Sequence, residues 1–413
     1  MRDAQCERRG RREPREPRQG RQGAGGFVVF PRVSATAGLT AAALVLAGCV
    51  PQDAGGGATP VPLPSPPPGA SSTPSGTPLE DALQPAGTPE DVVTGLEAPW
   101  SVLPIGDTGS TLISQRDAGT IVELDSTGQL REVTAVTGSV HEGEGGLLGL
   151  ALLQGGALLD GTADWVYAYY TSATDNRVVR MPLSGDPGAL ELGDQEEILT
   201  GLKKAGNHDG GRIAFGPDGM LYATVGDAGD PDAPQDPASL NGKILRMTPE
   251  GDVPDGNPLG DSLVWSLGHR NPQGLAWASD GTMWAAEFGQ DTWDELNRIE
   301  PGNNYGWPVV EGEAHDARFV DPVRQWSTDE ASPSGLAAVG GTLFLAGLGG
   351  RRLWVIQDDG AEATAYFSDE YGRIRDVLAA PDGSLWFLTN NTDGRGSPRD
   401  GDDRLVRIPL APA

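Results

Sequence analysis

Cysteine is nearly absent from this sequence of 413 residues, which contains only Cys6 and Cys49. Both lie before residue 50, so the rest of the chain can form no disulfide bond within itself. If the protein is exported, its folded part must be stabilised by core burial, closure of the fold or bound metal. A Cys-x-x-Cys-His motif is also missing, which excludes covalently attached c-type haem.

Basic residues are scarce. The chain has 30 Lys and Arg against 58 Asp and Glu, a formal net charge of −28. Residues 1–48 hold nine Arg and four acids, so the remainder carries 21 basic and 54 acidic residues, a net charge of −33. Such a field repels nucleic acid and anionic lipid, which excludes non-specific nucleic-acid binding.

The apolar run at residues 33–48 is too short to span a bilayer, which needs about twenty apolar residues. It follows several arginines and ends in small residues, as secretory signal peptides do. Its end, Leu46-Ala47-Gly48-Cys49, resembles the bacterial lipobox, in which the cysteine becomes the lipidated first residue. We expect export and anchoring to the outer face of the cell membrane through Cys49. An ordinary signal peptide with a chance cysteine is the alternative. The long leader suggests a translation start near Val28.

Residues 50–78 are rich in Pro, Gly, Ser and Thr and almost lack large apolar side chains. Such a segment cannot bury enough apolar area to fold and acts as a semi-rigid spacer. We therefore expect three parts, which are a leader and signal peptide at residues 1–49, a linker at 50–90 and a folded domain at 91–413.

The expected domain repeats one strand pattern, an apolar strand, an Asp-Gly or Gly-Gly turn and a second apolar strand. This pattern is typical of β-hairpins. Four clear copies lie at residues 212–227, 274–289, 335–349 and 377–390, and two looser copies lie at 99–125 and 146–183. Six hairpin units at spacings of tens of residues, with no long helical pattern between them, predict an all-β, six-bladed β-propeller. A β-sandwich of similar strand content is the alternative.

The chain has four histidines, and His208 lies just before the third repeat, in Gly-Asn-His-Asp-Gly-Gly-Arg. Asp227 ends the second strand of that repeat, so an antiparallel hairpin would bring its carboxylate back near His208. A carboxylate beside an imidazole fixes the tautomer and raises the basicity, as a general base requires. A turn histidine capped by its neighbours would give the same pattern.

Two further loops contain groups suited to an anion. Residues 268–274 (GHRNPQG) combine an arginine with two amides, which can clamp a planar anion unless the loop is locked by its own hydrogen bonds. Arg373 and Arg375 are two apart on an expected strand, so both guanidinium groups would face one side. They would repel each other unless an anion or acidic neighbours lie between them.

Oxygen-bearing residues are dense in EFGQDTWDELN (287–297) and NNYGWP (303–308). Calcium takes six to eight oxygen ligands, and the glycines let the backbone turn toward a ligand. EF-hand spacing is absent, so the pattern is compatible with a calcium site without specifying one.

HRNPQG, DELN followed by NYGWP, and GRIRD occur in this order across the repeats. Together they resemble the glucose/sorbosone dehydrogenase family, which includes soluble quinoprotein glucose dehydrogenase and periplasmic aldose sugar dehydrogenases. The resemblance extends from about residue 91 to the C-terminus. It implies pyrroloquinoline quinone (PQQ) and Ca²⁺ as cofactors and an aldose sugar as substrate. Membrane anchoring would place a membrane quinone or a cytochrome nearby as the electron acceptor.

The resemblance also implies roles for individual residues. His208 corresponds to the catalytic base, Asp227 to the carboxylate that orients it, and Arg270 to a residue at the quinone. The other implied positions are Glu144, Asn271, Gln273, Arg373 and Arg375 for the cofactor, the carbonyls of Gly289 and Gln290 for the active-site calcium, and Glu295 and Tyr305 for a second, structural calcium.

Two positions depart from the family pattern. Gly289-Gln290 stands where the family commonly has Gly-Pro, so the loop loses a rigid φ. A cofactor-facing lysine of some members aligns with Gly349. We expect either that Arg351 or Arg352 replaces its charge or that cofactor affinity is reduced.

The implied reaction is oxidation of the anomeric hydroxyl to a lactone. His208 would take the hydroxyl proton while the C1 hydride passes to the quinone C5 atom. Calcium would polarise the C5 carbonyl, and Arg270 would support the charge on its oxygen. Two other functions fit a propeller. One is a calcium-dependent lactonase, which has no use for paired arginines. The other is a non-catalytic propeller that binds a ligand or a protein.

Overall fold

The structure is a computed structural model that describes residues 82–155, 164–357, 359–360 and 362–413. The leader, Cys49 and the linker up to residue 81 lie outside these residues, so lipid anchoring stays a prediction. Within the described ranges, no helix combines the length and apolarity that a membrane span requires.

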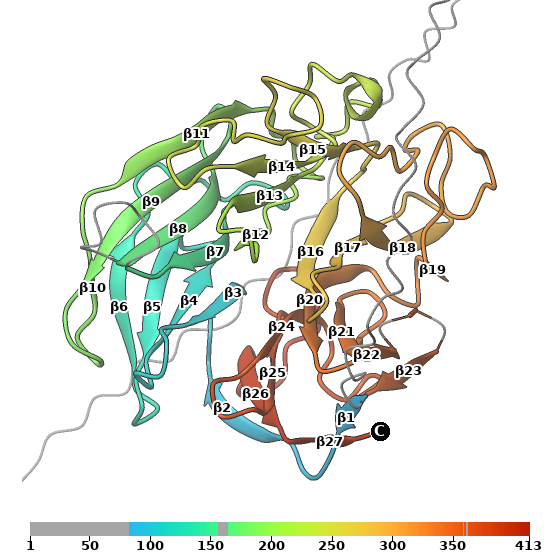
Figure 1. Ribbon diagram of the computed structural model, residues 1–413. Helices are drawn as coiled ribbons and strands as arrows, with labels where there is room; N and C mark the ends of the chain where they lie inside the picture. The colour runs from blue at the N-terminus through green and yellow to red at the C-terminus, as the bar shows by residue number, and fades with distance from the viewer. Residues whose placement is uncertain (1–81, 156–163, 358, 361) are drawn as a thin grey trace, which may run out of the picture. The chain divides into compact units, whose positions relative to one another are not determined.

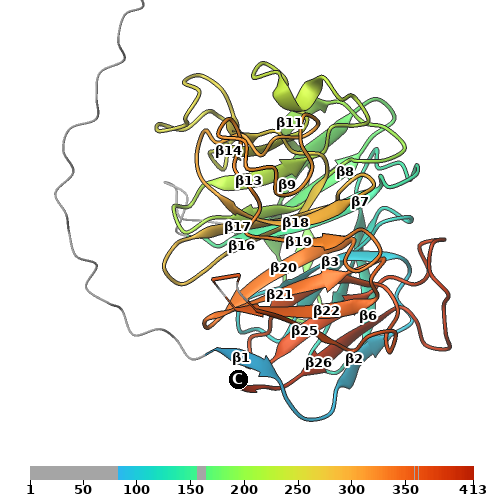
Figure 2. The same ribbon diagram turned by 90° about the vertical axis from the view of Figure 1, so that its right-hand side faces the viewer.

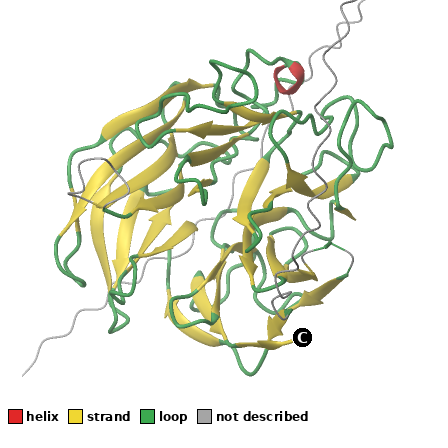
Figure 3. Cartoon of the chain, viewed as in Figure 1, coloured by secondary structure: helices red, strands yellow, loops and turns green. Residues whose placement is uncertain are grey.

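Six antiparallel sheets follow one another around a common centre (Figure 1), which confirms the six-bladed β-propeller. We number the sheets as blades 1 to 6. Consecutive blades contact each other through their inner strands, which are the first strands except that the second strand of blade 3 contacts the first strand of blade 4. The first strand of blade 6 contacts that of blade 1, which closes the ring. A single short helix, the 3₁₀ turn η1 (Ala233–Gln235), occurs in the described part of the chain (Figure 3).

Each blade runs outward from its first strand. Blade 1 contains β3 (Pro99–Pro104), β4 (Thr111–Gln115), β5 (Thr120–Leu124) and β6 (Leu130–Ala135). Blade 2 contains β7 (Leu147–Leu153), β8 (Asp164–Thr171) and β9 (Asn176–Ser184), with β10 (Glu191–Leu192) and β11 (Glu196–Leu202) both paired to β9. Blade 3 contains β12 (Ile213–Phe215), β13 (Leu221–Val225), β14 (Lys243–Met247) and β15 (Val264–Leu267).

The second half of the ring repeats this order. Blade 4 contains β16 (Pro272–Trp277), β17 (Met283–Glu287), β18 (Trp293–Ile299) and β19 (Arg324–Ser327). Blade 5 contains β20 (Pro333–Val339), β21 (Thr342–Gly347), β22 (Arg352–Gln357) and β23 (Ala363–Tyr366). Blade 6 contains β24 (Ile374–Ala379), β25 (Leu385–Thr389), β26 (Arg404–Ile408) and β2 (Glu90–Thr94).

The core lies between neighbouring blades, because both faces of each sheet are covered by the next. Tyr169 of blade 2, for example, belongs to one buried cluster with Ala223 and Leu245 of blade 3. Alternate strand residues face opposite sides of a sheet, so each strand supplies apolar side chains to both of its neighbours. This explains why the strands appear in the sequence as nearly continuous apolar runs.

Blade 6 is built from both ends of the described chain. Its outer strand β2 pairs with β26, and β1 (Leu83–Pro85) pairs with β27 (Leu410–Pro412) beside it (Figure 2). The folded domain therefore includes residues from Leu83, before the boundary expected at residue 91. Leu83 packs on the core between blades 5 and 6, and its amide donates to Thr342 Oγ1 at 2.8 Å.

The first strand of each blade begins at the same end of the ring as the second strand ends, because the two are antiparallel. Loops from every blade therefore meet at this end, as propellers commonly arrange their functional loops. They include residues 206–212, 268–271 and 372–375, which the sequence singled out.

Candidate functional site

His208 and Asp227 form a hydrogen-bonded pair at the mouth of blade 3. His208 Nδ1 lies 2.7 Å from Asp227 Oδ1, and both side chains are buried. Asp227 is fixed in turn, because its Oδ2 accepts from Trp307 Nε1 at 2.8 Å and its Oδ1 from the Gly229 amide at 2.7 Å. The carboxylate favours the tautomer with the proton on Nδ1. His208 Nε2, which has no hydrogen-bond partner among the described residues, then remains as a proton acceptor.

Glu144 of the loop before blade 2 connects this pair to blade 4. Its Oε2 accepts from the His208 amide at 2.9 Å and from Asn271 Nδ2 at 3.3 Å. Asn271 Oδ1 accepts in turn from the Gly210 amide at 3.0 Å. His208 has a φ of 61°, a conformation that costs a non-glycine residue about 1–3 kcal/mol. These bonds therefore hold the imidazole in an otherwise unfavourable turn.

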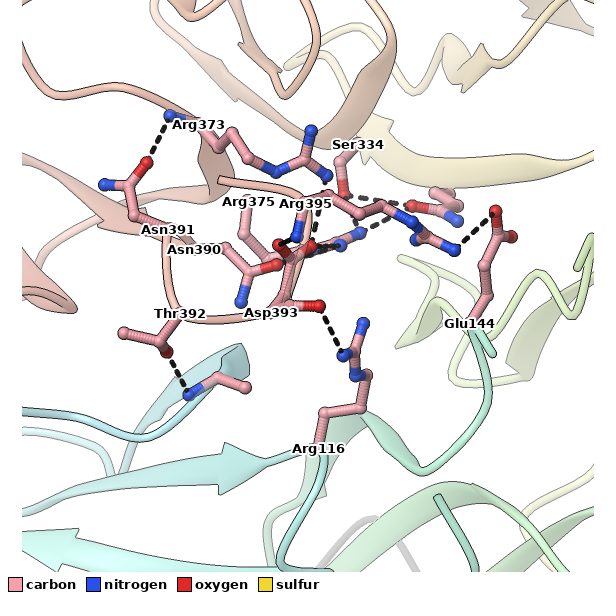
Figure 4. A network of polar contacts seen from close by, with 12 residues as sticks. Arg116, Glu144, Ser334, Arg373, Arg375, Asn390, Asn391, Thr392, Asp393 and Arg395 are labelled. Atoms are coloured by element: carbon pink, nitrogen blue, oxygen red, sulfur yellow. Dashed lines mark hydrogen bonds and ion pairs between the residues drawn. The ribbon is translucent and has the colours of Figure 1, made fainter. Parts of the chain in front are cut away.

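A cavity of about 250 Å³ lies beside Glu144 and is walled by residues of several blades. Its cationic lining is formed by four arginines, Arg116, Arg373, Arg375 and Arg395 (Figure 4). Arg373 and Arg375 thus contribute to one cavity, as their spacing predicted. The cavity also reaches Asp209 and Gly210, which adjoin His208 in the chain.

Arg375 is held rigidly at the base of this lining. Its Nε and Nη2 both donate to Asn390 Oδ1, at 3.2 and 3.0 Å, and its Nη1 donates to Gln273 Oε1 at 2.9 Å. Burial, together with the charges of Arg373 and Arg116, lowers the pKa of Arg375 to about 9. Its positive charge is therefore poorly compensated by the protein itself.

Asp393 is the carboxylate that lies among these arginines (Figure 4). Arg373 Nη2 is 3.1 Å from Asp393 Oδ2, and Arg375 Nη2 is 3.9 Å from the same oxygen. Burial alone would raise the pKa of Asp393, but Arg373 and Arg375 outweigh it and lower that pKa. Asp393 is thus shared by Arg373 and Arg375, while Arg116 pairs with Asp117 at 2.7 Å and Arg395 with Glu144 at 3.7 Å. Arg373 Nε stays buried without a partner among the described residues. The geometry suits an anion with several oxygen atoms.

Arg270 lies outside this lining and is engaged by the loop of blade 4. Its Nε and Nη2 donate to Gln290 Oε1 at 3.0 and 2.7 Å, and its Nη1 donates to the Phe288 carbonyl at 3.2 Å. Its guanidinium lies 5.5 Å from the ring centre of Trp307, the partner of Asp227. The glutamine that replaces the family proline therefore orients Arg270 close to the histidine pair.

Neither arginine expected to replace the missing lysine lines the cavity. Arg351 pairs with Asp369 at 2.9 Å, and Arg352 donates to the Gly350 carbonyl at 2.7 Å. A Cβ atom at Gly349 would lie 2.3 Å from Ser332 Oγ, so Ser332 would have to move before this position could hold a side chain. The additional cavity charge comes from Arg116 and Arg395 instead.

The proposed calcium residues fall into two places. Gly289 and Gln290 lie in the loop after β17, where the Gly289 amide donates to Asp294 Oδ1 at 2.9 Å and the Gln290 amide to Glu311 Oε1 at 2.6 Å. Glu295 is buried directly opposite Glu287 on the paired strand. Burial and the neighbouring charge of Glu287 raise the pKa of Glu295 to about 8.

The hydrogen bonds of the Tyr305 hydroxyl do not involve this acid pair. Its hydroxyl donates to the Arg298 carbonyl at 2.7 Å and accepts from the Glu300 amide at 2.9 Å, and its ring stacks on His269. No group of three or more His, Cys, Asp or Glu suited to a metal occurs in the described ranges. A calcium ion here would therefore depend on backbone and amide oxygens as well as carboxylates.

Asp209 is a buried acid that the sequence did not single out. Its Oδ1 accepts from Asn176 Nδ2 at 2.9 Å, whereas its Oδ2 is buried and meets no partner in the part of the chain that the structure describes. Burial is the main cause that raises its pKa to about 6. Folding therefore takes up a proton between about pH 4 and 6, and stability falls as pH rises through this range.

Replacing Asp209 with Asn is expected to raise the free energy of unfolding at pH 7 by about 1–3 kcal/mol, because the buried charge is removed. At about pH 3 the gain should largely vanish, since Asp209 is then mostly protonated in both states. Urea unfolding at the two pH values measures the difference. An equal gain at both would show that packing, and not charge, is responsible.

Sequence reasoning missed Arg116, Asp393 and Arg395. Arg116 directly follows β4, and the other two lie in the loop between β25 and β26. In a propeller, the residues that follow the second strand of a blade face the same mouth. That positional rule would have identified all three.

Comparison with known proteins identifies the family of the chain. A profile of the glucose/sorbosone dehydrogenase family matches residues 96–406. The aldose sugar dehydrogenase YliI of Escherichia coli is 27% identical, over 74% of this chain and 91% of that protein. Among solved structures, the PQQ-bound aldose sugar dehydrogenase of Streptomyces coelicolor is 48% identical, with a TM-score of 0.74 over 81% of this chain and 99% of that one.

A second structure, a putative oxidoreductase (glucose dehydrogenase) of Thermus thermophilus, is 41% identical with a TM-score of 0.71. The match covers 78% of this chain and 99% of that one. The family profile covers well over half of the sequence and includes every blade. The chain therefore belongs to the glucose/sorbosone dehydrogenase family.

Proposed function

We propose that the protein is a PQQ- and calcium-dependent aldose sugar dehydrogenase, which oxidises the anomeric hydroxyl of an aldose to a lactone. The observation that carries the proposal is one cavity that is lined by an undercompensated arginine cluster and by Glu144, whose carboxylate bonds the amide of His208 in the fixed His–Asp pair. A binding propeller would have no need of an imidazole held in an unfavourable turn. A lactonase would have no need of the arginines.

The residues of the cavity fit PQQ, which is a planar anion with several carboxylate groups. Arg373 Nε has no partner among the described residues, and burial together with the charges of Arg373 and Arg116 lowers the pKa of Arg375. Arg373, Arg375 and Arg116 would hold the carboxylates, and Gln273 and Asn271 lie in the same wall or next to it. When bound, PQQ supplies the acceptor for the hydride that leaves C1 of the sugar.

The protein's own groups would manage the proton and the developing charge. His208 Nε2 accepts the proton of the anomeric hydroxyl, and Asp227 stabilises the imidazolium that results. Glu144 holds the turn that aims the ring. Arg270, oriented by Gln290, provides positive charge beside the pair, where low solvent exposure strengthens its effect.

Calcium fits the donor atoms present. The loop at Gly289 and Gln290 offers carbonyl oxygens, which calcium prefers. At the second place, Glu295 and Glu287 are two buried acids in direct register, and Asn297 Oδ1 nearby is buried with no partner in the described ranges. A cation there would satisfy Asn297 Oδ1 and offset the burial and the Glu287 charge that raise the Glu295 pKa.

Activity is expected to require both cofactors. Protein purified without cofactor should reduce a dye in the presence of an aldose only after PQQ and Ca²⁺ are both added, and a chelator should abolish the rate. A panel of aldoses then defines the substrate range. Failure to bind PQQ in a titration, together with no activity, would favour the binding propeller.

Export and lipidation of Cys49 belong to the same proposal and are supported by the sequence pattern alone. They would place the site outside the cytoplasm, near a membrane quinone or a cytochrome as electron acceptor.

A further inference from the structure

We propose that a second pocket, next to the cofactor cavity, binds a small anionic electron acceptor. The pocket encloses about 400 Å³ and is lined by Arg351, Arg373, Arg395 and Arg399. The inference rests on the proposed dehydrogenase function and names the chemical class of its electron acceptor.

The two cavities are adjacent, since Leu348, Arg373 and Arg395 line both. Arg373 spans the boundary between them, with its Nη2 bonded to Asp393 and its Nε unpartnered within the described residues. An acceptor in the second pocket would therefore lie one side chain away from the anion held in the first. A separation of one side chain between the acceptor and the bound cofactor suits electron transfer, and it does not require the acceptor to contact the sugar.

The place of the second pocket in the ring separates the acceptor from the sugar substrate. The base, His208, belongs to blade 3, whereas the second pocket is formed by loops of blades 5 and 6. In a ring of six, blades 3 and 6 are opposite each other. Sugar could then enter on one side of the mouth while the acceptor occupies the other.

The charge of the pocket is opposite to that of the protein. The chain has a net charge of −28, yet the lining of this pocket has four arginines and one acid, Asp369. Two of these arginines also face acids of the first cavity, since Arg373 lies 3.1 Å from Asp393 and Arg395 lies 3.7 Å from Glu144. Asp369 pairs with Arg351 at 2.9 Å, and the guanidinium of Arg399 donates to the carbonyls of Asp369 and Glu370, which carry no charge. A local positive potential in a negative field concentrates anions at this point.

The pocket favours a small molecule over a protein partner. Its volume lies in the range of small-molecule sites, and its arginines line a recess. Arg351 and Arg395 are 58% and 44% exposed, so an acceptor can reach them from solvent. Hexacyanoferrate(III) is a suitable probe, because it is a compact trianion.

The electron count is complete with this probe. An aldose that becomes a lactone releases two electrons and two protons. Each hexacyanoferrate(III) takes one electron and becomes hexacyanoferrate(II), so two are consumed for each sugar, and the protons pass to solvent.

The test compares Arg351→Gln and Arg399→Gln with wild type, using the full chain loaded with PQQ and Ca²⁺. The KM for hexacyanoferrate(III) should rise about two- to fivefold for each substitution, as expected for one exposed charge contact. The KM for a cationic acceptor, phenazine methosulfate, should not rise. The matched control is Arg298→Gln. Arg298 is 59% exposed and paired with Glu300, at the opposite end of β18 from the mouth.

A second readout does not need turnover. Hexacyanoferrate(II) cannot accept electrons, so calorimetry measures its binding directly, and both variants should bind it more weakly than wild type and Arg298→Gln. Unchanged KM and affinity in both variants would overturn the proposal, as would an equal rise in KM for the cationic acceptor. If wild type turns over with neither acceptor, the proposed function fails, and calorimetry alone then decides whether the anion site exists.

Discussion

Replacement of His208 with Gln is expected to lower turnover by about 10²- to 10⁴-fold, the range that general acid–base catalysis contributes. Glutamine is similar in size and polarity, but it cannot take up a proton at neutral pH. PQQ affinity should stay close to wild type, because the cavity arginines that would hold the cofactor are untouched. Steady-state rates and a PQQ titration on the same preparation separate the two effects.

A matched control is available in His315→Gln. His315 is 79% exposed and bonded to Asp321, outside the cavity, so its loss should leave turnover unchanged. If His208→Gln keeps a rate near wild type, His208 is not the base. If PQQ affinity falls together with the rate, its role is to shape the cavity.

Replacement of Arg375 with Met should weaken PQQ binding by about 10²-fold or more. Truncating one partner of a buried, hydrogen-bonded charge pair costs about 2–5 kcal/mol. Arg375 is buried and already oriented by Asn390 and Gln273. The substitution therefore removes a positive charge that is in position for PQQ before the cofactor binds. Fluorescence or calorimetric titration of the cofactor-free protein gives the affinity directly.

Two further variants define the cause. Arg375→Lys keeps a charge but loses the planar fork, so its PQQ affinity should be intermediate. Arg352→Met removes an arginine that stacks on Trp354 outside the cavity and should bind PQQ like wild type. Equal affinities for wild type and a folded Arg375→Met, with folding checked by thermal melting, would contradict the assigned role.

The hairpins of the propeller were predictable because their chemistry is local. A turn such as Pro217-Asp218-Gly219 adopts its shape from three residues, and Gly219 has the positive φ of 76° that the turn requires. The same turn recurs between apolar strands in several blades, so the blade number followed. Asp227 was matched to His208 for the same reason, since one hairpin brings them together.

The rest of the site depends on contacts between different blades. Arg375 of blade 6 bonds Gln273 of blade 4, and Arg395 of blade 6 lies 3.7 Å from Glu144 before blade 2, and no local pattern indicates either contact. Strand β2 (EDVVT) was also missed, because as an outer strand it has exposed residues and no clear alternation. Its pairing with β26, more than 300 residues later in the chain, leaves no local signal.

This pairing of β2 with β26 joins the two ends of the folded domain. The ring closes only when strands from the two ends of the domain meet, so a chain truncated before residue 404 cannot close blade 6. Until then β2 is an open edge, free to pair with another chain. Contacts at such a separation form slowly, because a long loop must close before they gain any stability. The interval between emergence of β2 and arrival of β26 is thus when the protein is most exposed to aggregation and proteolysis.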